Sequence, residues 1–380
     1  MKLILHIGTA KTGTTALQHF LCVNAKKLRK YGIHYATPPN EFNFNSITNT
    51  LLLTGLDKFR TFFLNQLKVA ERDGAHTIIA SSESLYSISA LLEERNLIEQ
   101  LRASIPAEVE CRVLCYVRRP DHCLESLYNQ NVKRGVIGAG LLGDQTRQVS
   151  LFTGDVIDFL KIIEGMLDYH RCLSIWREVF GSSACSVRAY EAALPNLIED
   201  FVRHVLDLED ISSFTQLRLR SNERISRDVL EYKRLRHENI SYSEHKLERK
   251  IFELVDKIIT SPNNNHEYLS PDERAALLSR LEPSMERLRT EFTLPPFPRF
   301  DLEAASASWQ PYPGLSLEKR REIEHHYNAV QRQVGFRLER LLIRAASLTR
   351  RRLPFLSWLL DSARGSGIRR LLLEATSRFQ

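Results

Sequence analysis

The stretch GTAKTGTT, residues 8–15, follows the apolar run LILHI at residues 3–7 and precedes a segment with apolar residues at helical spacing. A strand, a turn rich in glycine and threonine and then a helix is an arrangement that binds anions, because backbone N–H groups of the turn and of the helix N-terminus point at the ligand. Gly8 and Gly13 permit a tight turn and close approach. A capped turn without a ligand is the simpler alternative, but the threonine run and the lysine favour anion binding. The candidate anion-binding residues of the loop are Lys11, Thr12, Gly13, Thr14 and Thr15.

The spacing of this loop is close to the phosphate-binding pattern G-x-x-x-x-G-K-[ST], whose lysine contacts terminal phosphates and whose hydroxyl binds Mg²⁺. Thr14 occupies the lysine position here, and the lysine of the loop, Lys11, comes three residues earlier. This displacement argues against ATP chemistry. Lys11 can instead reach the bridging oxygen between a 5′-phosphate and a transferred group. A sulfuryl group carries less charge than a phosphoryl group, so one lysine can replace a metal as the stabilising charge.

The segment KTGTTAL, Lys11–Leu17, resembles the 5′-phosphosulfate loop of sulfotransferases that use PAPS (3′-phosphoadenosine 5′-phosphosulfate). It is more similar to the carbohydrate, heparan-sulfate-like branch and its bacterial relatives than to the small-molecule branch, which usually has tryptophan where this chain has Ala16. The resemblance implies a metal-free enzyme that moves a sulfuryl group from PAPS to a hydroxyl or amine, with a carbohydrate or glycolipid as the acceptor. It covers roughly residues 1–240.

A second motif, YVRRPDHCLESLYNQ at residues 116–130, supports the same resemblance. The family places an arginine at a strand end and a serine eight residues later to bind the 3′-phosphate, and these positions are Arg118 and Ser126 here. An arginine fork binds phosphate through two hydrogen bonds, and a serine hydroxyl adds a donor. Taken alone, an arginine at a strand end and a serine on a helix need no ligand. The order and distance after the first loop favour the functional interpretation.

The family resemblance also implies a catalytic base, a glutamate or histidine, after an intervening strand. In IIASSESLY, residues 78–86, this position is Glu83, which is suited to take the proton of an acceptor hydroxyl. The alternative is that Glu83 caps the next helix. His122, beside the second motif, is the fallback base. Further candidates for ligand contact, with solvent exposure or capping as the equal alternative, are Gln130, Lys133, Arg188, Tyr190 and Asn222.

Hydrophobic patterning predicts an α/β fold, a P-loop-like parallel sheet flanked by helices, with a helical C-terminal region. We divide the chain into a sulfotransferase-like domain at 1–300, with the motifs within 1–240, and a helical basic extension at 301–380. Buried strands are expected at 2–7, 32–36, 76–81, 111–117 and 184–189. Helices are expected at 13–30, 56–72, 93–104, 120–134, 195–206, 222–239, 243–259, 270–289, 316–334 and 336–352, with a capping box at Ser270 and Glu273.

The composition of the 380 residues is that of a globular protein, with 43% hydrophobic residues. No apolar run approaches the roughly 20 residues of a membrane span, and the first residues do not resemble a signal peptide, so we expect a cytoplasmic location. The six cysteines form no C-x-x-C motif. We therefore interpret them as reduced thiols and expect neither a disulfide framework nor a metal site.

The positive charge of the chain is concentrated at its C-terminal end. Residues 337–380 contain ten arginines against three acidic residues, a difference of +7 that equals the net charge of the whole chain. These arginines alternate with leucine, phenylalanine and tryptophan, which suits a helix lying on an anionic membrane surface. A helical appendage packed on the core, with solvated arginines, is the equal alternative. Nucleic acid is not favoured, because the rest of the chain is neutral and lacks an aromatic stacking platform.

Two other functions remain open at the level of sequence. The first is an atypical P-loop nucleotide kinase or NTPase, which magnesium-dependent ATP turnover would support. The second is a non-catalytic, membrane-associated nucleotide-binding protein, which the presence of both Lys11 and Glu83 disfavours.

Overall fold

The computed structural model describes residues 1–54, 56–90, 94–135, 151–209, 211–215, 224–240, 242–259 and 267–332. The basic tail at 337–380, the helix expected at 336–352 and the candidate residue Asn222 lie outside the described residues. The membrane interpretation of the tail and the division at residue 300 therefore stay predictions. Within the described part, no helix combines the length and the apolar character needed to cross a membrane.

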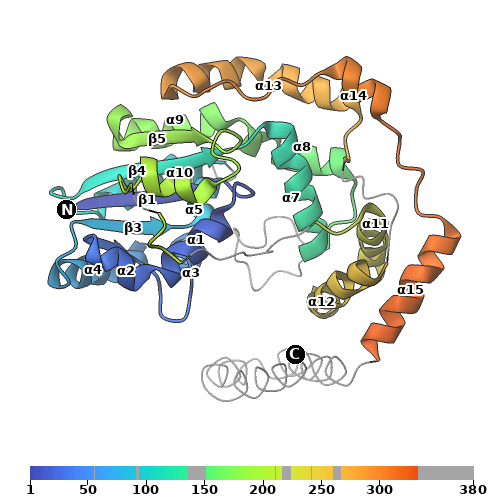
Figure 1. Cartoon of the computed structure of the whole chain (residues 1–380), viewed down its shortest axis with the longest axis horizontal. Helices are drawn as coiled ribbons and strands as arrows, with labels where there is room; N and C mark the ends of the chain where they lie inside the picture. The colour runs from blue at the N-terminus through green and yellow to red at the C-terminus, as the bar shows by residue number, and fades with distance from the viewer. Residues whose placement is uncertain are drawn as a thin grey trace.

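A five-stranded parallel sheet forms the centre of the N-terminal half, in the order β2-β3-β1-β4-β5 (Figure 1). In the register of the sheet, Leu3 of β1 lies between Ile78 of β3 and Cys111 of β4. Each strand begins and ends within one residue of its expected position, so the predicted α/β fold is confirmed. The strands are β1 (Lys2–Gly8), β2 (Ile33–Tyr35), β3 (Thr77–Ser81), β4 (Glu110–Val117) and β5 (Cys185–Ala189).

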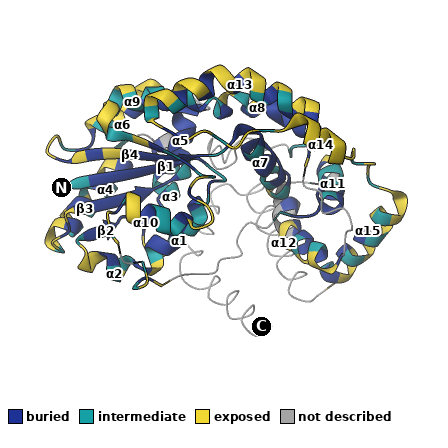
Figure 2. Cartoon of the chain, turned by 45° about the horizontal axis from the view of Figure 1, so that its top comes forward, coloured by how far each residue is buried: buried dark blue, intermediate teal, exposed yellow. Residues whose placement is uncertain are grey.

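Helices cover both faces of this sheet because its strands are apolar on both sides (Figure 2). Ile4 of β1 packs with α1 (Thr14–Val23), α2 (Ala25–Lys30) and α10 (Leu197–His204) on one face. Leu3, Leu5 and Ile7 belong to the core on the other face. There the covering helices are α3 (Asn45–Thr54), α4 (Leu56–Arg72), α5 (Glu83–Ala90), α6 (Arg95–Ala103) and α9 (Tyr169–Phe180).

After β4, the regular elements of the described residues are helices, apart from β5. Its helix α7 (Pro120–Arg134) begins beside the sheet and runs away from it, in contact with α8, α11, α12 and α13 (Figure 1). Ser270 and Glu273 form the predicted capping box at the start of α13. The other elements are α8 (Val156–Leu167), α11 (Arg227–Arg236), α12 (Tyr242–Ile258), α13 (Pro271–Phe292), α14 (Leu302–Ser308), α15 (Leu317–Gln331) and the short turns η1 (Ser182–Ala184) and η2 (His237–Asn239).

Three expected helices differ from the observed elements, and five described helices were not expected. The helix expected at 13–30 is divided at Asn24 into α1 and α2, and the side chain of Asn24 bonds Phe20 and Thr215 backbone groups. In the regions expected as single helices at 195–206 and 222–239, the described helices are the shorter α10 and α11. Helices α3, α5, α8, α9 and α14 were not predicted.

The parallel strands direct their carboxyl ends toward one edge of the sheet. The loop after β1, Glu83 after β3, Arg118 after β4 and Tyr190 after β5 all begin there. Because β1 is central and the chain continues from it to both sides, this loop lies where the strand order reverses, which is where open α/β sheets bind ligands.

Candidate active site

The loop between β1 and α1 has a backbone that only certain residues adopt easily. Gly13, the residue before α1, has φ +75°, and Lys11 has φ +69°. A Cβ atom on Gly13 would lie 2.3 Å from Cδ2 of Leu197 in α10, so glycine is required for conformation and for space. The left-handed backbone conformation of Lys11 is sterically unfavourable for a residue with a side chain. The side chain of Lys11 has its observed orientation in this conformation.

Two threonines fix the loop against the neighbouring strand. The backbone N–H and the hydroxyl of Thr9 both donate to the carbonyl oxygen of Tyr116 in β4, at 2.8 and 3.2 Å. The hydroxyl of Thr12 donates to the carbonyl oxygen of Thr9 at 2.7 Å. Thr12, expected to contribute a hydroxyl to an anion, therefore uses that hydroxyl inside the loop, and its backbone N–H is what it can offer a ligand.

Thr14 connects the loop to the candidate base. Its hydroxyl donates to Oε2 of Glu83 at 2.6 Å, and both residues begin helices at the carboxyl edge of the sheet. The alternative for Glu83 was a capping role after Ser81 or Ser82. Its carboxylate instead contacts the loop, while the Ser82 hydroxyl donates to Asn45. This hydrogen bond holds the carboxylate beside the loop.

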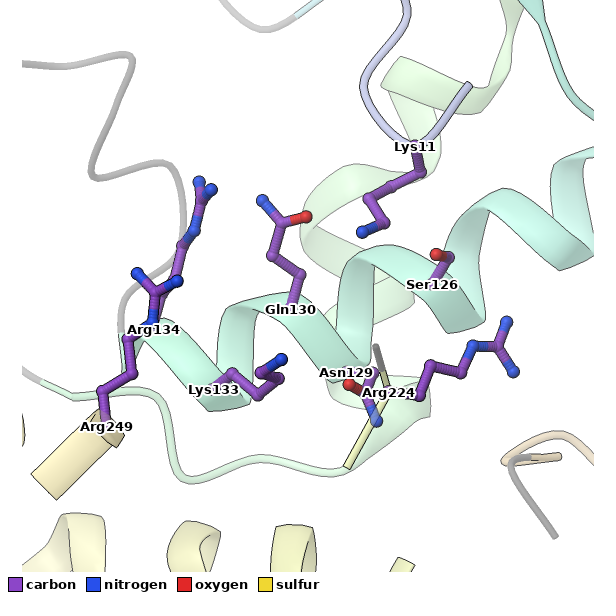
Figure 3. A pocket seen from close by; sticks show the side chains of 8 residues that line it. All are labelled: Lys11, Ser126, Asn129, Gln130, Lys133, Arg134, Arg224 and Arg249. Carbon is purple, nitrogen blue, oxygen red and sulfur yellow. The ribbon is translucent and has the colours of Figure 1, made fainter. Parts of the chain in front are cut away.

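Lys11 extends from the loop into an open pocket (Figure 3). Its amine points toward α7, between Ser126 and Gln130. The structure therefore brings together the lysine of the first motif and the serine of the second, which are far apart in the sequence. The pocket is lined by Lys11, Ser126, Asn129, Gln130, Lys133, Arg134, Arg224 and Arg249.

The electrostatic environment of Lys11 is strongly positive. The pKa of its amine is lowered from 10.5 to about 8, mainly by burial and also by the positive charges of Arg134 and Lys133, while the carboxylate of Glu83 opposes the shift. Lys11 is thus a lysine whose charge is held at an energetic disadvantage. An anion bound beside it would reverse this disadvantage.

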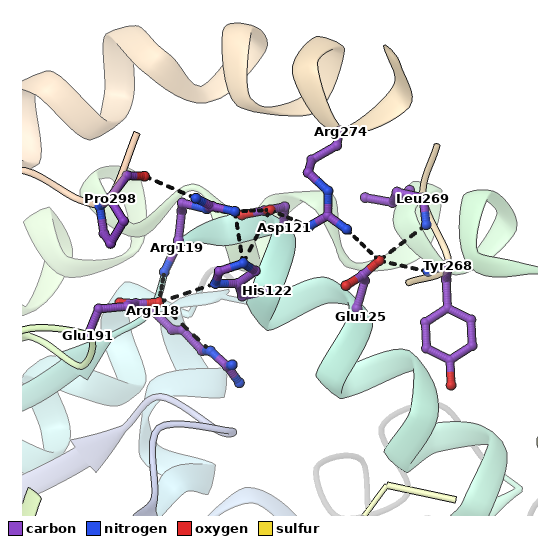
Figure 4. Close-up of polar contacts among 10 residues, drawn as sticks. All are labelled: Arg118, Arg119, Asp121, His122, Glu125, Glu191, Tyr268, Leu269, Arg274 and Pro298. Atoms are coloured by element: carbon purple, nitrogen blue, oxygen red, sulfur yellow. Dashed lines mark hydrogen bonds and ion pairs between the residues drawn. The ribbon is translucent and has the colours of Figure 1, made fainter. Parts of the chain in front are cut away.

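Arg118 lies at the end of β4, where the second motif predicts it, but outside the residues that line the pocket. Its guanidinium lies over the ring of Tyr190, 5.5 Å from the ring centre, and its Nε is 3.8 Å from Oε1 of Glu191 (Figure 4). This Nε is buried and has no hydrogen-bond partner among the described residues. A buried donor without a partner is rare in proteins and is consistent with a missing acceptor.

The positive charges of Arg118 and Lys11 both act on the buried thiol of Cys123. Burial raises the pKa of Cys123, and the positive charges of Arg118 and Lys11 oppose that shift. Both cations therefore lie around the same side chain, in the first turn of α7. Arg118 and Ser126 were expected to act on one phosphate, and Cys123 lies between them in the sequence.

His122, the fallback base, takes part in a polar network. Its ring contacts the guanidinium of Arg119 at 2.8 Å through Nε2, and its Nδ1 lies 3.7 Å from Oε1 of Glu191 (Figure 4). It faces this network, whereas Glu83 faces the loop.

The network continues into the core and joins α7 to α13. Asp121 accepts two hydrogen bonds from Arg119, at 2.7 and 2.8 Å, and a further bond from Arg274. Arg274 also donates to Glu125 at 2.9 Å. The pKa of Asp121 falls to about 2 because these hydrogen bonds and the neighbouring positive charges outweigh its burial. Opposite charges are matched one to one here, which indicates a structural role.

The structure gives positions to the other candidate residues, and it also shows pocket residues that the sequence analysis did not single out. Arg188 donates to Asp200 of α10 at 2.8 Å through Nε, an ion pair at the edge of the sheet. Gln130 and Lys133 were candidates and line the pocket. Asn129, Arg134, Arg224 and Arg249 also line it but were not singled out.

The sequence contained a signal that could have identified Arg134 as a pocket residue. It follows Ser126 by eight residues and so lies on the same helix face. No sequence signal could have identified Arg249, since its position depends on how α12 packs on α7.

No family model matches the chain, and no curated protein matches it. Among the solved structures that match is a sulfotransferase from Alicyclobacillus acidocaldarius. The alignment covers 77% of this chain and 96% of that chain, with a TM-score of 0.42 and 11% sequence identity. At this distance the functional assignment depends on the site itself.

Proposed function

We propose that this chain is a PAPS-dependent sulfotransferase that transfers a sulfuryl group to a hydroxyl or amine, with a carbohydrate as the acceptor. The observation that supports this proposal most directly is that Lys11 and Ser126 line one pocket. They belong to two separate motifs of the family that the sequence resembles. Chance resemblance in either motif alone would give no reason for the two residues to meet.

The residues of the site suit the charges of PAPS. The loop backbone from Thr12 to Thr15 and the N-terminus of α1 would hold the 5′-phosphosulfate, with the amine of Lys11 beside the bridging oxygen. The guanidinium of Arg118, whose Nε lacks a partner among the described residues, and the hydroxyl of Ser126 would hold the 3′-phosphate. The ring of Tyr190 packs against Arg118 and restricts the orientation of its guanidinium.

The proposed reaction assigns one residue to the leaving oxygen and one to the acceptor hydroxyl. The acceptor oxygen forms a bond to sulfur, and the bond between sulfur and the bridging oxygen breaks. Lys11 stabilises the negative charge that develops on that oxygen, which leaves with the nucleotide. Glu83 takes the proton of the acceptor hydroxyl, and the hydrogen bond from Thr14 orients its carboxylate for this step.

Ligand binding without a metal tests this proposal. We expect PAP, the nucleotide product, to stabilise the protein in the presence of EDTA. At 100 times its Kd, the gain in the free energy of unfolding is about 2.7 kcal/mol. The measurement is a thermal melt with PAP and EDTA, compared with ATP and Mg²⁺.

Two outcomes separate the proposed function from the nucleotide kinase or NTPase. Stabilisation by ATP and Mg²⁺ with no effect of PAP would reject the sulfotransferase and support the other enzyme. Stabilisation by PAP that Arg118→Ala abolishes, in a variant whose melting temperature without ligand is unchanged, would support the assignment of the 3′-phosphate to this arginine.

A further inference from the structure

We infer that a buried chain of polar side chains positions Glu83 for its role as the base. The chain consists of Gln18 of α1, Ser81 at the end of β3 and His6 of β1, which are joined by hydrogen bonds. All three side chains are buried, so they act through Glu83 and are positioning residues. The inference rests on the proposed function and extends it to residues outside the pocket.

The hydrogen bonds of this chain connect a helix to two strands of the sheet. The amide nitrogen of Gln18 donates to the Ser81 hydroxyl at 3.2 Å, and this hydroxyl lies 2.8 Å from Nδ1 of His6. His6 and Ser81 are also register partners in the ladder between β1 and β3. The exposed fractions of Gln18, Ser81 and His6 are 1%, 0% and 1%, so water cannot replace a bond that is lost here.

A backbone group determines the direction of the hydrogen bonds. The N–H of Asn45 can only donate, and it donates to Oδ1 of Asn43 at 3.0 Å. The amide nitrogen of Asn43 therefore donates to Oε1 of Gln18 at 3.4 Å, which leaves the amide nitrogen of Gln18 to donate to Ser81. The Ser81 hydroxyl then donates its own proton to Nδ1 of His6.

His6 is neutral, as this direction requires. Burial lowers its pKa from 6.5 to about 4, and the backbone of Gly8 opposes the shift. Nδ1 of a neutral imidazole accepts a hydrogen bond when the ring proton is on Nε2. Nε2 is buried and makes no hydrogen bond to the described residues. The chain thus ends at the His6 ring, two residues before Gly8, where the anion-binding loop begins.

The chain is parallel to the contact that holds the base. Gln18 follows Thr14 by four residues, so the two side chains lie on one face of α1. Ser81 precedes Glu83 by two residues. The bond from Thr14 to Glu83 and the bond from Gln18 to Ser81 therefore join the same two segments at two points. Two such bonds fix the orientation of the segment that carries the base more narrowly than one.

Apolar packing does not require polar side chains in these strands. Leu5 and Ile7 beside His6, and Ile79 and Ala80 before Ser81, are buried apolar residues. Burial of a hydroxyl or an imidazole costs free energy, which its hydrogen bonds offset. A buried polar network whose groups are bonded specifies one arrangement of its surroundings. These polar residues stand at the carboxyl ends of the strands, where the base has to be oriented.

The test compares the effect of Ser81→Ala with and without the carboxylate of Glu83. Water serves as the acceptor, so the assay measures the release of radiolabelled sulfate from saturating PAPS in the presence of EDTA. Ser81→Ala should lower kcat about tenfold, the contribution of about one hydrogen bond. In the Glu83→Gln background the same substitution should change kcat less than about twofold, because residues that act through one group are not additive. The Kd for PAP should stay constant in all variants.

Ser104→Ala is the matched control. Ser104 is a buried serine that follows α6 near the amino end of β4, and its hydroxyl donates to the carbonyl oxygen of Leu101 at 2.7 Å. Its substitution should leave kcat unchanged in both backgrounds.

Two substitutions of His6 test the chain without removing the bond between Gln18 and Ser81. His6→Asn retains an acceptor near the position of Nδ1 and should keep most of kcat. His6→Leu has no acceptor and should lose about tenfold. Their difference remains measurable if Ser81→Ala does not fold.

A crystal structure of each folded variant tests the position of Glu83 directly. The hydrogen bond from Thr14 to Glu83 should be present in wild type, Ser104→Ala and His6→Asn, and absent in Ser81→Ala and His6→Leu. An unmoved carboxylate in both of the latter, equal losses of kcat in the two Glu83 backgrounds, or equal losses in the two His6 variants would overturn the inference. Failure of the wild type to bind PAP, or to release sulfate faster than free PAPS does, would instead reject the proposed function, and the crystal structures would still decide whether the chain positions Glu83.

Discussion

The two ends of α7 carry charged residues of opposite character. At its start, Asp121 and Glu125 are buried and receive hydrogen bonds from Arg119 and Arg274, so the charges are matched. At its end, Lys133 and Arg134 lie with Arg249 of α12 beside an open pocket, and the carboxylate of Glu253 is 3.9 Å from the Lys133 amine. One helix thus has a buried cluster of matched charges at its start and a group of cations beside an open pocket at its end.

This difference separates structural charge from binding charge. A buried ion pair contributes to the fold when its partners and hydrogen bonds are all present, and it becomes strongly unfavourable when one partner is removed. Exposed like charges have little effect on the fold, but they concentrate a positive field where a ligand can enter. The two ends of α7 should therefore respond to substitution in opposite ways.

The largest expected effect is at the start of α7. Arg274→Met removes the buried cation that bonds both Asp121 and Glu125 and leaves two carboxylates with only Arg119 as a charged donor, so the free energy of unfolding should fall by about 3–5 kcal/mol. Chemical denaturation with guanidinium chloride measures this change. A loss smaller than about 0.5 kcal/mol would mean that the start of α7 does not depend on matched charges, and the comparison would fail.

The second-largest effect is expected for turnover, from a substitution of Glu83 at the carboxyl edge of the sheet. Glu83→Gln keeps a side chain of similar shape that can accept the Thr14 hydrogen bond but cannot take a proton. Turnover should fall by roughly 10²–10⁴, the usual contribution of a general base, while the Kd for PAP stays constant. Near-full turnover would place the base elsewhere. His122→Gln, which changes the network at the start of α7, is then the variant to assay.

A smaller effect is expected from pH, through Lys11. Its pKa in the free protein is about 8, and an anionic nucleotide binds its protonated form better. The Kd for PAP should therefore be constant well below pH 8 and should increase about tenfold per pH unit above it, until the pKa of the complex is reached. Titration calorimetry between pH 6.5 and 9.5 measures this slope (about three units around the pKa). In Lys11→Arg, whose charge does not titrate, the Kd should stay flat; a matching slope there would assign the effect to another group.

The smallest effect is expected at the end of α7. Arg134→Gln removes one charge from a group of like charges on an exposed side chain, so the free energy of unfolding should change by no more than about 0.5 kcal/mol. The measurement is the same denaturation used for Arg274→Met. A loss of several kcal/mol would show that Arg134 is structural and that the two ends of α7 are alike.

Much of the fold could be predicted because local signals agree with tertiary structure. The strands are continuous apolar runs, as both faces of the sheet are covered. Helix α7 begins at Pro120 and ends before Gly135, the residue types that favour a helix start and a left-handed cap. Helices α8 and α9 were missed although α8 has an Asp155 cap and apolar residues at helical spacing, so the signal was present but was not used.

The candidate site could be predicted where its residues follow strands. Lys11, Glu83 and Arg118 come soon after the carboxyl ends of β1, β3 and β4, so their proximity follows from a parallel sheet. The pocket wall formed by Arg224 and Arg249 could not be predicted. Its position depends on packing between α7, α11 and α12, and no local sequence pattern specifies which faces of separate helices meet.

The position of the pocket along α7 has a consequence for regiochemistry. Ser126, assigned to the nucleotide, and Arg134 both line the pocket and belong to one helix, so the number of helical residues between them sets the length of this side of the pocket. That length limits how far from the nucleotide an acceptor can extend while its reacting hydroxyl lies at the sulfur atom. Four inserted residues would lengthen this side by about 6 Å while nearly preserving the face.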